Sequence, residues 1–90
     1  MRLILRTPAD FGAIIRDRRK ALGLDQSDLA GRIGVSRLWV NQVEKGKPGA
    51  SLGLVLRALA AVGVELTASL GDASSDTSLE QEAPLDIDAI

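Results

Sequence analysis

The most constraining feature of this sequence is the stretch from Gln26 to Gly46, QSDLAGRIGVSRLWVNQVEKG, in which two short helical patterns meet at a glycine. Leu29, Ala30 and Ile33 recur at helical spacing and predict one buried stripe. Gly34 follows them, and glycine enters left-handed backbone conformations without a steric penalty. The stretch therefore predicts two helices that are joined by a tight turn and packed against each other.

The second helix is expected to run from residue 37 to about residue 45, with Ser36 as its N-cap, because a serine hydroxyl accepts from free backbone N–H groups of the first turn. At about 100° per residue, Val40 and Val43 point inward and Glu44 lies at the edge. The outward face is mostly polar and basic: Arg37, Leu38, Asn41, Gln42 and Lys45. Such side chains contact base edges and phosphates in the DNA major groove. An ordinary solvated helix face would have a similar composition.

Two further helices are expected, one on each side of this pair. Thr7 and Pro8 begin a helix that runs to about Leu22, and Ser51 begins another that ends at Gly63. The expected buried stripes are Phe11, Ile15 and Leu22 in the first, and Leu52, Val55, Leu56, Leu59 and Val62 in the second. Asp25 should cap the helix that begins at Gln26.

Short strands are expected at the two ends of this helical body. Apolar side chains alternate in residues 2–6 and in residues 64–70, as in half-buried strands. Two strands alone are marginal in water, so pairing with the same strands of a second chain is expected. The sequence thus predicts a homodimer held together by Leu3, Leu5, Val64, Leu66, Ala68 and Leu70.

The composition excludes several classes of function. The 90 residues form one small domain and contain no cysteine, histidine or tyrosine. Thiolate metal sites and most of the usual acid–base groups are therefore missing, and we expect neither an enzyme nor a cofactor. No apolar run approaches the about 20 residues of a membrane span, and the N-terminal segment MRLILRTPAD has too short an apolar core for a secretory signal. A cytoplasmic protein is expected.

Charge divides the chain into a domain of residues 1–70 and a tail of residues 71–90. All eleven Lys and Arg side chains and six acidic ones lie in the domain, whereas the tail has six acidic and no basic ones. A domain charge of +5 against −6 in the tail favours contact between the domain and nucleic acid. We expect the tail to be disordered in isolation. Its apolar residues, Leu79, Leu85, Ile87 and Ile90, suit either a docking segment or a plain solvated tail.

The segment IIRDRRKALGLDQSDLAGRIGVSRLWVNQVEKG resembles the Cro/repressor-type (XRE) helix-turn-helix family through the pattern R-x-x-x-G-L-x-Q-x-x-L-A-x-x-x-G-V-S-x-x-x-V-x-x-x-E-x-G. With the continuation SLGLVLRALAAVGVEL and the preceding strand, residues 2–70 are most similar to HipB-type antitoxins. The sequence departs from the common pattern at Asp25 and Trp39. The resemblance implies a mainly α, four-to-five-helix, lambda-repressor-like domain whose short N- and C-terminal strands form an intersubunit sheet.

The resemblance also implies a function. It indicates a sequence-specific repressor that binds a palindromic operator as a homodimer. It further indicates the antitoxin of a type II toxin–antitoxin system, which autoregulates its operon and binds a HipA-like serine/threonine kinase toxin. A stand-alone XRE-family regulator without a toxin is the alternative. A protein-interaction module that has lost DNA binding is a third class, and the polar, basic face of residues 37–45 argues against it.

The resemblance assigns roles to individual residues as well. Gln26 matches a glutamine that contacts a phosphate, although without the family it is a plain polar residue of a first helical turn. Arg19 is expected to pair with Glu44. Trp39 lies at the edge of the buried arc, where it either packs beside Val43 or touches DNA. The full expected DNA-binding set is Gln26, Ser36, Arg37, Leu38, Asn41, Gln42, Lys45 and Lys47.

Overall fold

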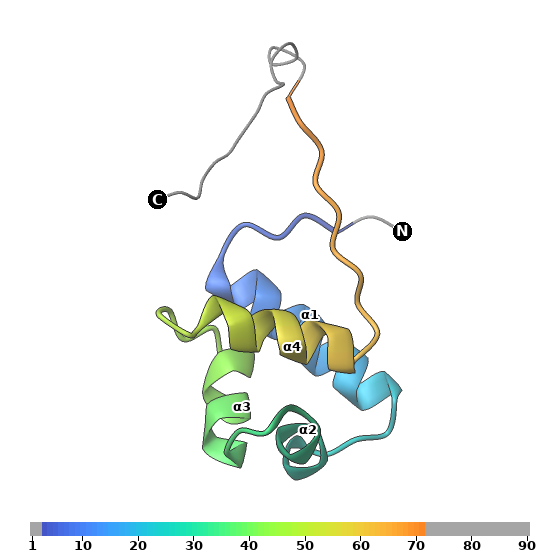
Figure 1. The fold of residues 1–90 in the computed structure, drawn as a ribbon, viewed down its shortest axis with the longest axis vertical. Coiled ribbons are helices and arrows are strands. Elements are labelled where there is room, and N and C mark those ends of the chain that lie inside the picture. The colour runs from blue at the N-terminus through green and yellow to red at the C-terminus, as the bar shows by residue number, and fades with distance from the viewer. Residues whose placement is uncertain (1–2, 72–90) are drawn as a thin grey trace.

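Four helices make up the ordered body of the protein in this computed structural model, which describes residues 3–71. They are α1 (Pro8–Ala21), α2 (Gln26–Ile33), α3 (Arg37–Glu44) and α4 (Leu52–Ala61) (Figure 1). Both α1 and α2 pack against α3 and α4. The prediction of a mainly α, four-helix body with a helix–turn–helix arrangement is confirmed.

Each helix begins at a residue whose side chain accepts a hydrogen bond from the backbone of the first turn. These caps are Thr7, Asp25, Ser36 and Ser51, as the sequence predicts. In α1 and α2 the third helical residue, Asp10 or Asp28, accepts in return from the N–H of the cap residue. Such reciprocal bonds satisfy donors that a helix N-terminus otherwise leaves free.

The turn between α2 and α3 depends on Gly34, which has φ 78° and ψ 36°. The N–H groups of Gly34 and Val35 both donate to the carbonyl of Ala30, at 2.9 and 3.0 Å. This left-handed residue closes α2 and turns the chain directly into the cap of α3. The predicted tight turn is therefore present.

The core lies between all four helices. Its buried apolar members are Ile15, Leu29, Ala30, Ile33, Val40, Val43, Ala58, Leu59 and Val62. Gly12 brings α1 very close to α3: a β-carbon at this position would clash with the carbonyl oxygen of Val43 and lie 2.9 Å from that of Glu44. The residue pattern around Gly12 gives no sign of this close approach.

Three of the leucines expected in the core are exposed instead. Leu22 is 46% exposed because α1 ends at Ala21, so Leu22 leaves the helical stripe. Leu52 and Leu56 are 68% and 44% exposed, because α4 turns the side that carries Ala58 and Leu59 toward the other helices. The predicted burial of these three leucines was wrong.

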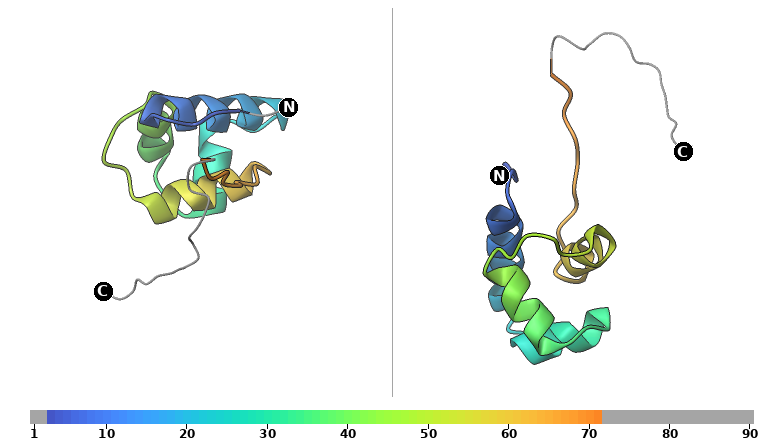
Figure 2. Two further views of the ribbon diagram at one scale, coloured as in Figure 1. Left: turned by 90° about the horizontal axis from the view of Figure 1, so that it is seen from above. Right: turned by 90° about the vertical axis from the view of Figure 1, so that its left-hand side faces the viewer.

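The two ends of the described chain run as extended segments on the side of the body away from α2 and α3 (Figures 1 and 2). Neither 3–7 nor 64–71 forms a strand within the described part of the chain. Leu3, Leu66, Ala68 and Leu70 are exposed, and Leu5 and Val64 are half-buried. The intersubunit sheet stays a prediction, since a single chain cannot form it. The tail residues Leu79, Leu85, Ile87 and Ile90 lie outside the described residues.

Candidate nucleic-acid interface

Helix α3 has the two faces that its sequence predicts. Val40 and Val43 are buried, at 1% and 5% exposure. Leu38 is 61% exposed, and the two basic side chains Arg37 and Lys45 are also exposed. Asn41 and Gln42 are half-buried. The helix thus turns a basic and amide-bearing surface to solvent while its apolar side holds it in the core.

Two polar groups beside this face already have partners in the chain. The Ser36 hydroxyl accepts from the N–H of Trp39 at 3.0 Å and so begins α3. The ammonium group of Lys47 donates to Oε1 of Gln42 at 3.2 Å. This bond joins the loop after α3 to the exposed face and keeps a positive charge beside it.

Trp39 is half-buried and packs against the core cluster. Its outer side borders a hollow of about 170 Å³ that Gln42, Lys47 and Ala50 also line. The Trp39 ring therefore packs against the core, which is one of the two roles expected for it. Part of the ring stays at the surface, next to the exposed face of α3.

An ion pair joins Arg19 of α1 to Glu44 of α3. The distances are 2.6 Å from Nε to Oε2 and 2.9 Å from Nη2 to Oε1, so the contact is bidentate. Both residues are buried, Arg19 at 8% and Glu44 at 9% exposure. The hydrogen bond to Glu44 raises the pKa of the Arg19 guanidinium, which also donates to the Leu24 carbonyl at 2.9 Å. Glu44 lies inside the body and not at the edge that the helical wheel indicated.

The ion pair continues into two side-chain amides. Nε2 of Gln26, the first residue of α2, donates to Oε1 of Glu44 at 3.0 Å. Nδ2 of Asn41 in turn donates to Oε1 of Gln26 at 3.4 Å. We call Arg19, Glu44, Gln26 and Asn41 the polar network. The family resemblance implied the Arg19–Glu44 pair but not the two amides, although Asn41 and Glu44 share a side of α3 at i, i+3.

Two other basic side chains of the body donate hydrogen bonds to carbonyl groups at helix ends. Arg18 donates to the Val62 carbonyl at 3.0 Å, and Arg57 donates to the Ile33 carbonyl at 3.1 Å. These contacts satisfy carbonyl groups at the C-termini of α4 and α2. Arg16 and Lys20 of α1 are exposed. Only some of the basic side chains of the body are therefore free to contact an anionic partner.

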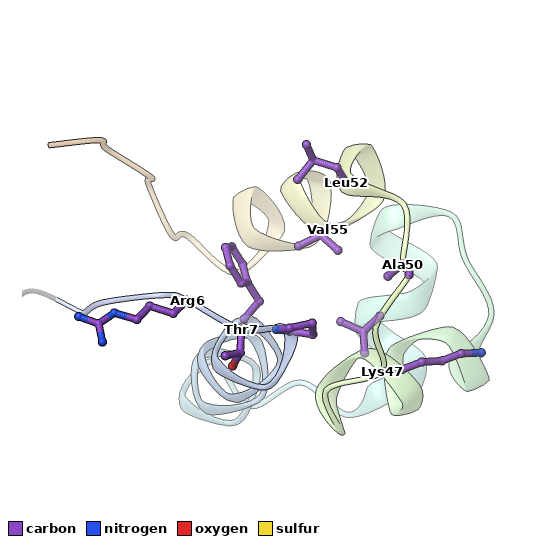
Figure 3. A pocket seen from close by; sticks show the side chains of 10 residues that line it. Arg6, Thr7, Lys47, Ala50, Leu52 and Val55 are labelled. Carbon is purple, nitrogen blue, oxygen red and sulfur yellow. The ribbon is translucent and has the colours of Figure 1, made fainter. Parts of the chain in front are cut away.

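An apolar cavity of about 240 Å³ lies between the start of α1, the loop after α3 and the start of α4 (Figure 3). Phe11, Val43 and Val55 line it, together with Ala50 and the exposed Leu52. The charged end of Arg6 points away from it (Figure 3). Its volume is below the about 300–1,000 Å³ of small-molecule sites, so it carries no ligand hypothesis.

Residues 3–71 contain no group of three His, Cys, Asp or Glu side chains that could hold a metal ion. No helix in this range is long and apolar enough to cross a membrane.

Comparison with known proteins identifies the fold and its class. Residues 10–70 match the family described as "Helix-turn-helix domain". The chain belongs to the helix-turn-helix family, of the XRE type. It is 42% identical over 62 residues to the "Uncharacterized HTH-type transcriptional regulator y4mF" of Sinorhizobium fredii, covering 69% of this chain and 82% of that protein. An "Uncharacterized HTH-type transcriptional regulator" of Methanothermobacter thermautotrophicus is 46% identical over 52 residues, covering 58% of this chain and 75% of that protein.

Solved structures of helix-turn-helix proteins share the arrangement. The restriction-modification controller protein C.AhdI from Aeromonas hydrophila is 36% identical, with a TM-score of 0.58 over 64% of this chain and 84% of its own. A HipB-O4 20mer complex has a TM-score of 0.68 over 76% of this chain and 96% of its own, at 19% identity. The HipB likeness establishes the shared fold. Family membership makes this protein a DNA-binding transcriptional regulator of the helix-turn-helix type.

Proposed function

We propose that this protein is a sequence-specific repressor that binds a palindromic operator as a homodimer, with α3 in the major groove. The observation that carries the proposal is the surface of α3. Arg37, Leu38 and Lys45 are exposed on this helix, and the buried Arg19–Glu44 pair fixes the helix against α1. In a helix-turn-helix protein the second helix of the motif enters the groove.

The side chains of this face divide into two groups by their chemistry. We assign base contacts to Arg37, Leu38 and Gln42, since base-edge contacts specify sequence. Phosphate contacts fall to Lys45, Lys47 and Gln26, because the two lysines are exposed cations and a helix N-terminus attracts anions. Ser36 lies at the start of α3, where its hydroxyl hydrogen can reach a phosphate while its oxygen caps the helix.

A second copy of the chain is part of the proposal. Leu3 and Leu70 are 55% and 78% exposed on extended segments that lie away from α2 and α3 (Figure 1). A sheet made there by two chains would cover these side chains and leave both copies of α3 free. The two α3 helices would then lie about 34 Å apart, one turn of DNA.

The experiment is selection of bound duplexes from a randomised DNA pool, followed by a count of protein chains per duplex. We expect an inverted repeat whose half-sites lie about one helical turn apart, bound by two chains. Recovery of unrelated sequences, or of single half-sites bound by one chain, would contradict the proposal.

For the biological setting we propose an antitoxin role that resembles HipB, with autoregulation of an operon and a HipA-like serine/threonine kinase toxin as partner. Support comes from the motif resemblance over residues 2–70 and from a fold that covers 96% of a HipB chain. Such a protein acts on chromosomal DNA and is therefore proposed to be cytoplasmic. Co-expression with the product of the adjacent gene should yield a stable complex, and that product should be a kinase.

A stand-alone regulator without a toxin is the second candidate. It is favoured by the sequence identities, which are 42% for y4mF and 36% for the controller protein C.AhdI, against 19% for HipB. If no neighbouring gene encodes a kinase that co-purifies with the protein, this second candidate replaces the antitoxin role and leaves the repressor proposal unchanged.

A further inference from the structure

Asn41 is the one amide on the solvent side of α3 to which the proposed function gives no task. Its side chain is half-buried and its Nδ2 donates to Oε1 of Gln26 at 3.4 Å. Asn41 therefore reaches across from α3 to the first residue of α2. Asn41 is thus held by a contact within the chain, whereas Leu38 on the same helix is 61% exposed.

The orientation of the Gln26 amide is fixed by its other neighbour. Glu44 accepts two hydrogen bonds from Arg19, at 2.6 and 2.9 Å, so its carboxylate is ionised and can only accept. Gln26 must then turn its Nε2 toward Glu44, at 3.0 Å, which leaves its Oε1 facing Asn41. Both ends of the Gln26 side chain are thus held before any partner arrives.

The charges at the start of α2 give a reason why an ordered Gln26 side chain would favour DNA binding. Asp25 and Asp28 form the capping box at the same helix start, so two carboxylates lie at the first turn of α2. Negative charge there weakens the attraction of the helix N-terminus for an anion. A neutral amide that is already ordered loses less conformational entropy on binding than a free one.

We infer that Asn41 is a positioning residue: together with Glu44 it orders the Gln26 carboxamide for its contact with the DNA backbone, and its contribution to DNA binding passes through Gln26. This inference rests on the proposed function, from which it takes the phosphate contact of Gln26. It assigns to Asn41 a role that changes affinity for all DNA and not the preference among sequences.

The test is a double-mutant cycle on the full chain with Gln26→Ala, Asn41→Ala and the double variant. Affinities are measured by fluorescence anisotropy for the best duplex from the randomised pool and for a random duplex of equal length. We expect Asn41→Ala to weaken both roughly two- to tenfold, the effect of ordering one rotamer-rich side chain on binding. The double variant should bind no more weakly than Gln26→Ala, because the two residues act in series.

A matched control uses the other amide of α3. Gln42 lies outside the polar network, although it accepts from Lys47. Gln42→Ala should therefore reduce the difference in affinity between the selected and the random duplex, which Asn41→Ala should leave unchanged, and its effect should add to that of Gln26→Ala. Asn41→Gln keeps an amide donor and should recover most of the affinity that Asn41→Ala loses. Loss of sequence preference in Asn41→Ala, or full additivity with Gln26→Ala, would overturn the inference.

A second measurement needs no DNA. In a nitrogen–proton correlation spectrum, the side-chain amide resonances of Gln26 should be well dispersed in the wild-type chain and collapse toward free values in Asn41→Ala. Unchanged resonances would overturn the inference even if Asn41→Ala bound DNA weakly. If instead Gln26→Ala leaves DNA binding intact while the resonances respond to Asn41, the phosphate role of Gln26 in the proposed function fails and the positioning of Gln26 by Asn41 stands.

Discussion

Arg19 and Glu44 form a buried ion pair in the described body. Their side chains are only 9% and 3% exposed, and the guanidinium meets the carboxylate through two hydrogen bonds. A buried pair of this kind adds little over a well-packed apolar pair, but loss of one member leaves the other charge buried and unpaired. The pair therefore acts as a constraint that fixes α1 against α3.

The first prediction concerns this pair. Glu44→Gln should lower the free energy of unfolding by about 3–5 kcal/mol, the usual cost of breaking a buried ion pair from one side. Asp17→Asn provides the control, because the Asp17–Arg16 contact is 3.9 Å long and exposed. That change should alter the free energy of unfolding by about 0–1 kcal/mol. Urea denaturation measures both, and equal effects would show that burial of the Glu44 pair is unimportant.

The second prediction separates base from phosphate contacts. Arg37→Ala should cost about 1–3 kcal/mol of binding free energy at the selected duplex and relax its preference, since an arginine contacts base edges. Lys47→Ala should weaken binding to all duplexes alike and reduce the dependence of affinity on salt, as loss of a phosphate contact does. Anisotropy titrations over a range of salt concentrations test both variants. Equal losses on selected and random DNA for Arg37→Ala would contradict the assignment.

The third prediction is a pH dependence from Asp10. Hydrogen bonds from the N–H groups of Arg6 and Thr7 hold the pKa of the Asp10 carboxyl below its usual value of 3.8. A lowered pKa in the folded chain means that this group stabilises the fold above pH 3.8, and the stabilisation is lost as pH falls through the lower value. Asp10→Asn should therefore destabilise the protein at neutral pH more than at strongly acid pH. A constant difference in thermal stability between the two proteins across that range would refute it.

At the scale of elements, the fold depends on how closely α1 crosses α3. Gly12 permits this crossing, since a β-carbon would meet the backbone carbonyl groups of Val43 and Glu44, which cannot move as a flexible side chain would. The Arg19–Glu44 pair joins the same two helices further along α1. Close backbone contact and a buried ion pair thus hold α3 at one height and angle relative to α1.

The fourth prediction uses two helical glycines. Gly12→Ala should lower the free energy of unfolding by about 1–3 kcal/mol, because overpacking at a close helix crossing forces backbone shifts. Gly31→Ala in α2 adds a β-carbon that meets nothing within 4 Å. It should raise the free energy of unfolding by about 0.4–1 kcal/mol, because alanine loses less backbone entropy. Chemical denaturation of both variants measures the difference, and a neutral Gly12→Ala would contradict the close crossing.

At the scale of the whole molecule, most of the exposed large apolar residues outside the α3 face lie in two places. Leu3, Ile4, Leu66 and Leu70 lie on the extended ends, Leu52 and Leu56 lie on α4, and Leu22 is exposed separately after the end of α1. Only the ends carry the alternation that predicts strands, and together they line a hollow of about 560 Å³ with Ile14. We place the contact with the second chain at the ends.

The fifth prediction tests this placement. Leu66→Asp should convert the proposed dimer to monomer, because it puts a charge into the expected apolar contact, while helical content remains. Leu52→Asp is the matched control, since Leu52 is 68% exposed on α4. It should leave the dimer intact. Sedimentation velocity distinguishes the outcomes, and dissociation by Leu52→Asp alone would move the interface to α4.

Features that depend on neighbours within one or two helical turns could be predicted from the order of the residues. The four caps, the turn at Gly34 and the two faces of α3 follow from residue types at fixed spacing, and all are present. Local hydrogen bonding and side-chain direction decide such features, so no knowledge of distant residues is needed.

The packing of the helices sets the features that depend on which distant surfaces meet. It placed Gly12 against α3, connected Asn41 to Gln26, buried Glu44 and left Leu52 and Leu56 exposed. Helical periodicity gives a stripe but not the angle at which a neighbouring helix covers it, and side-chain amides reveal no partner through spacing alone. Those choices belong to the packing of α1, α2 and α4 around α3, which the complete fold alone specifies.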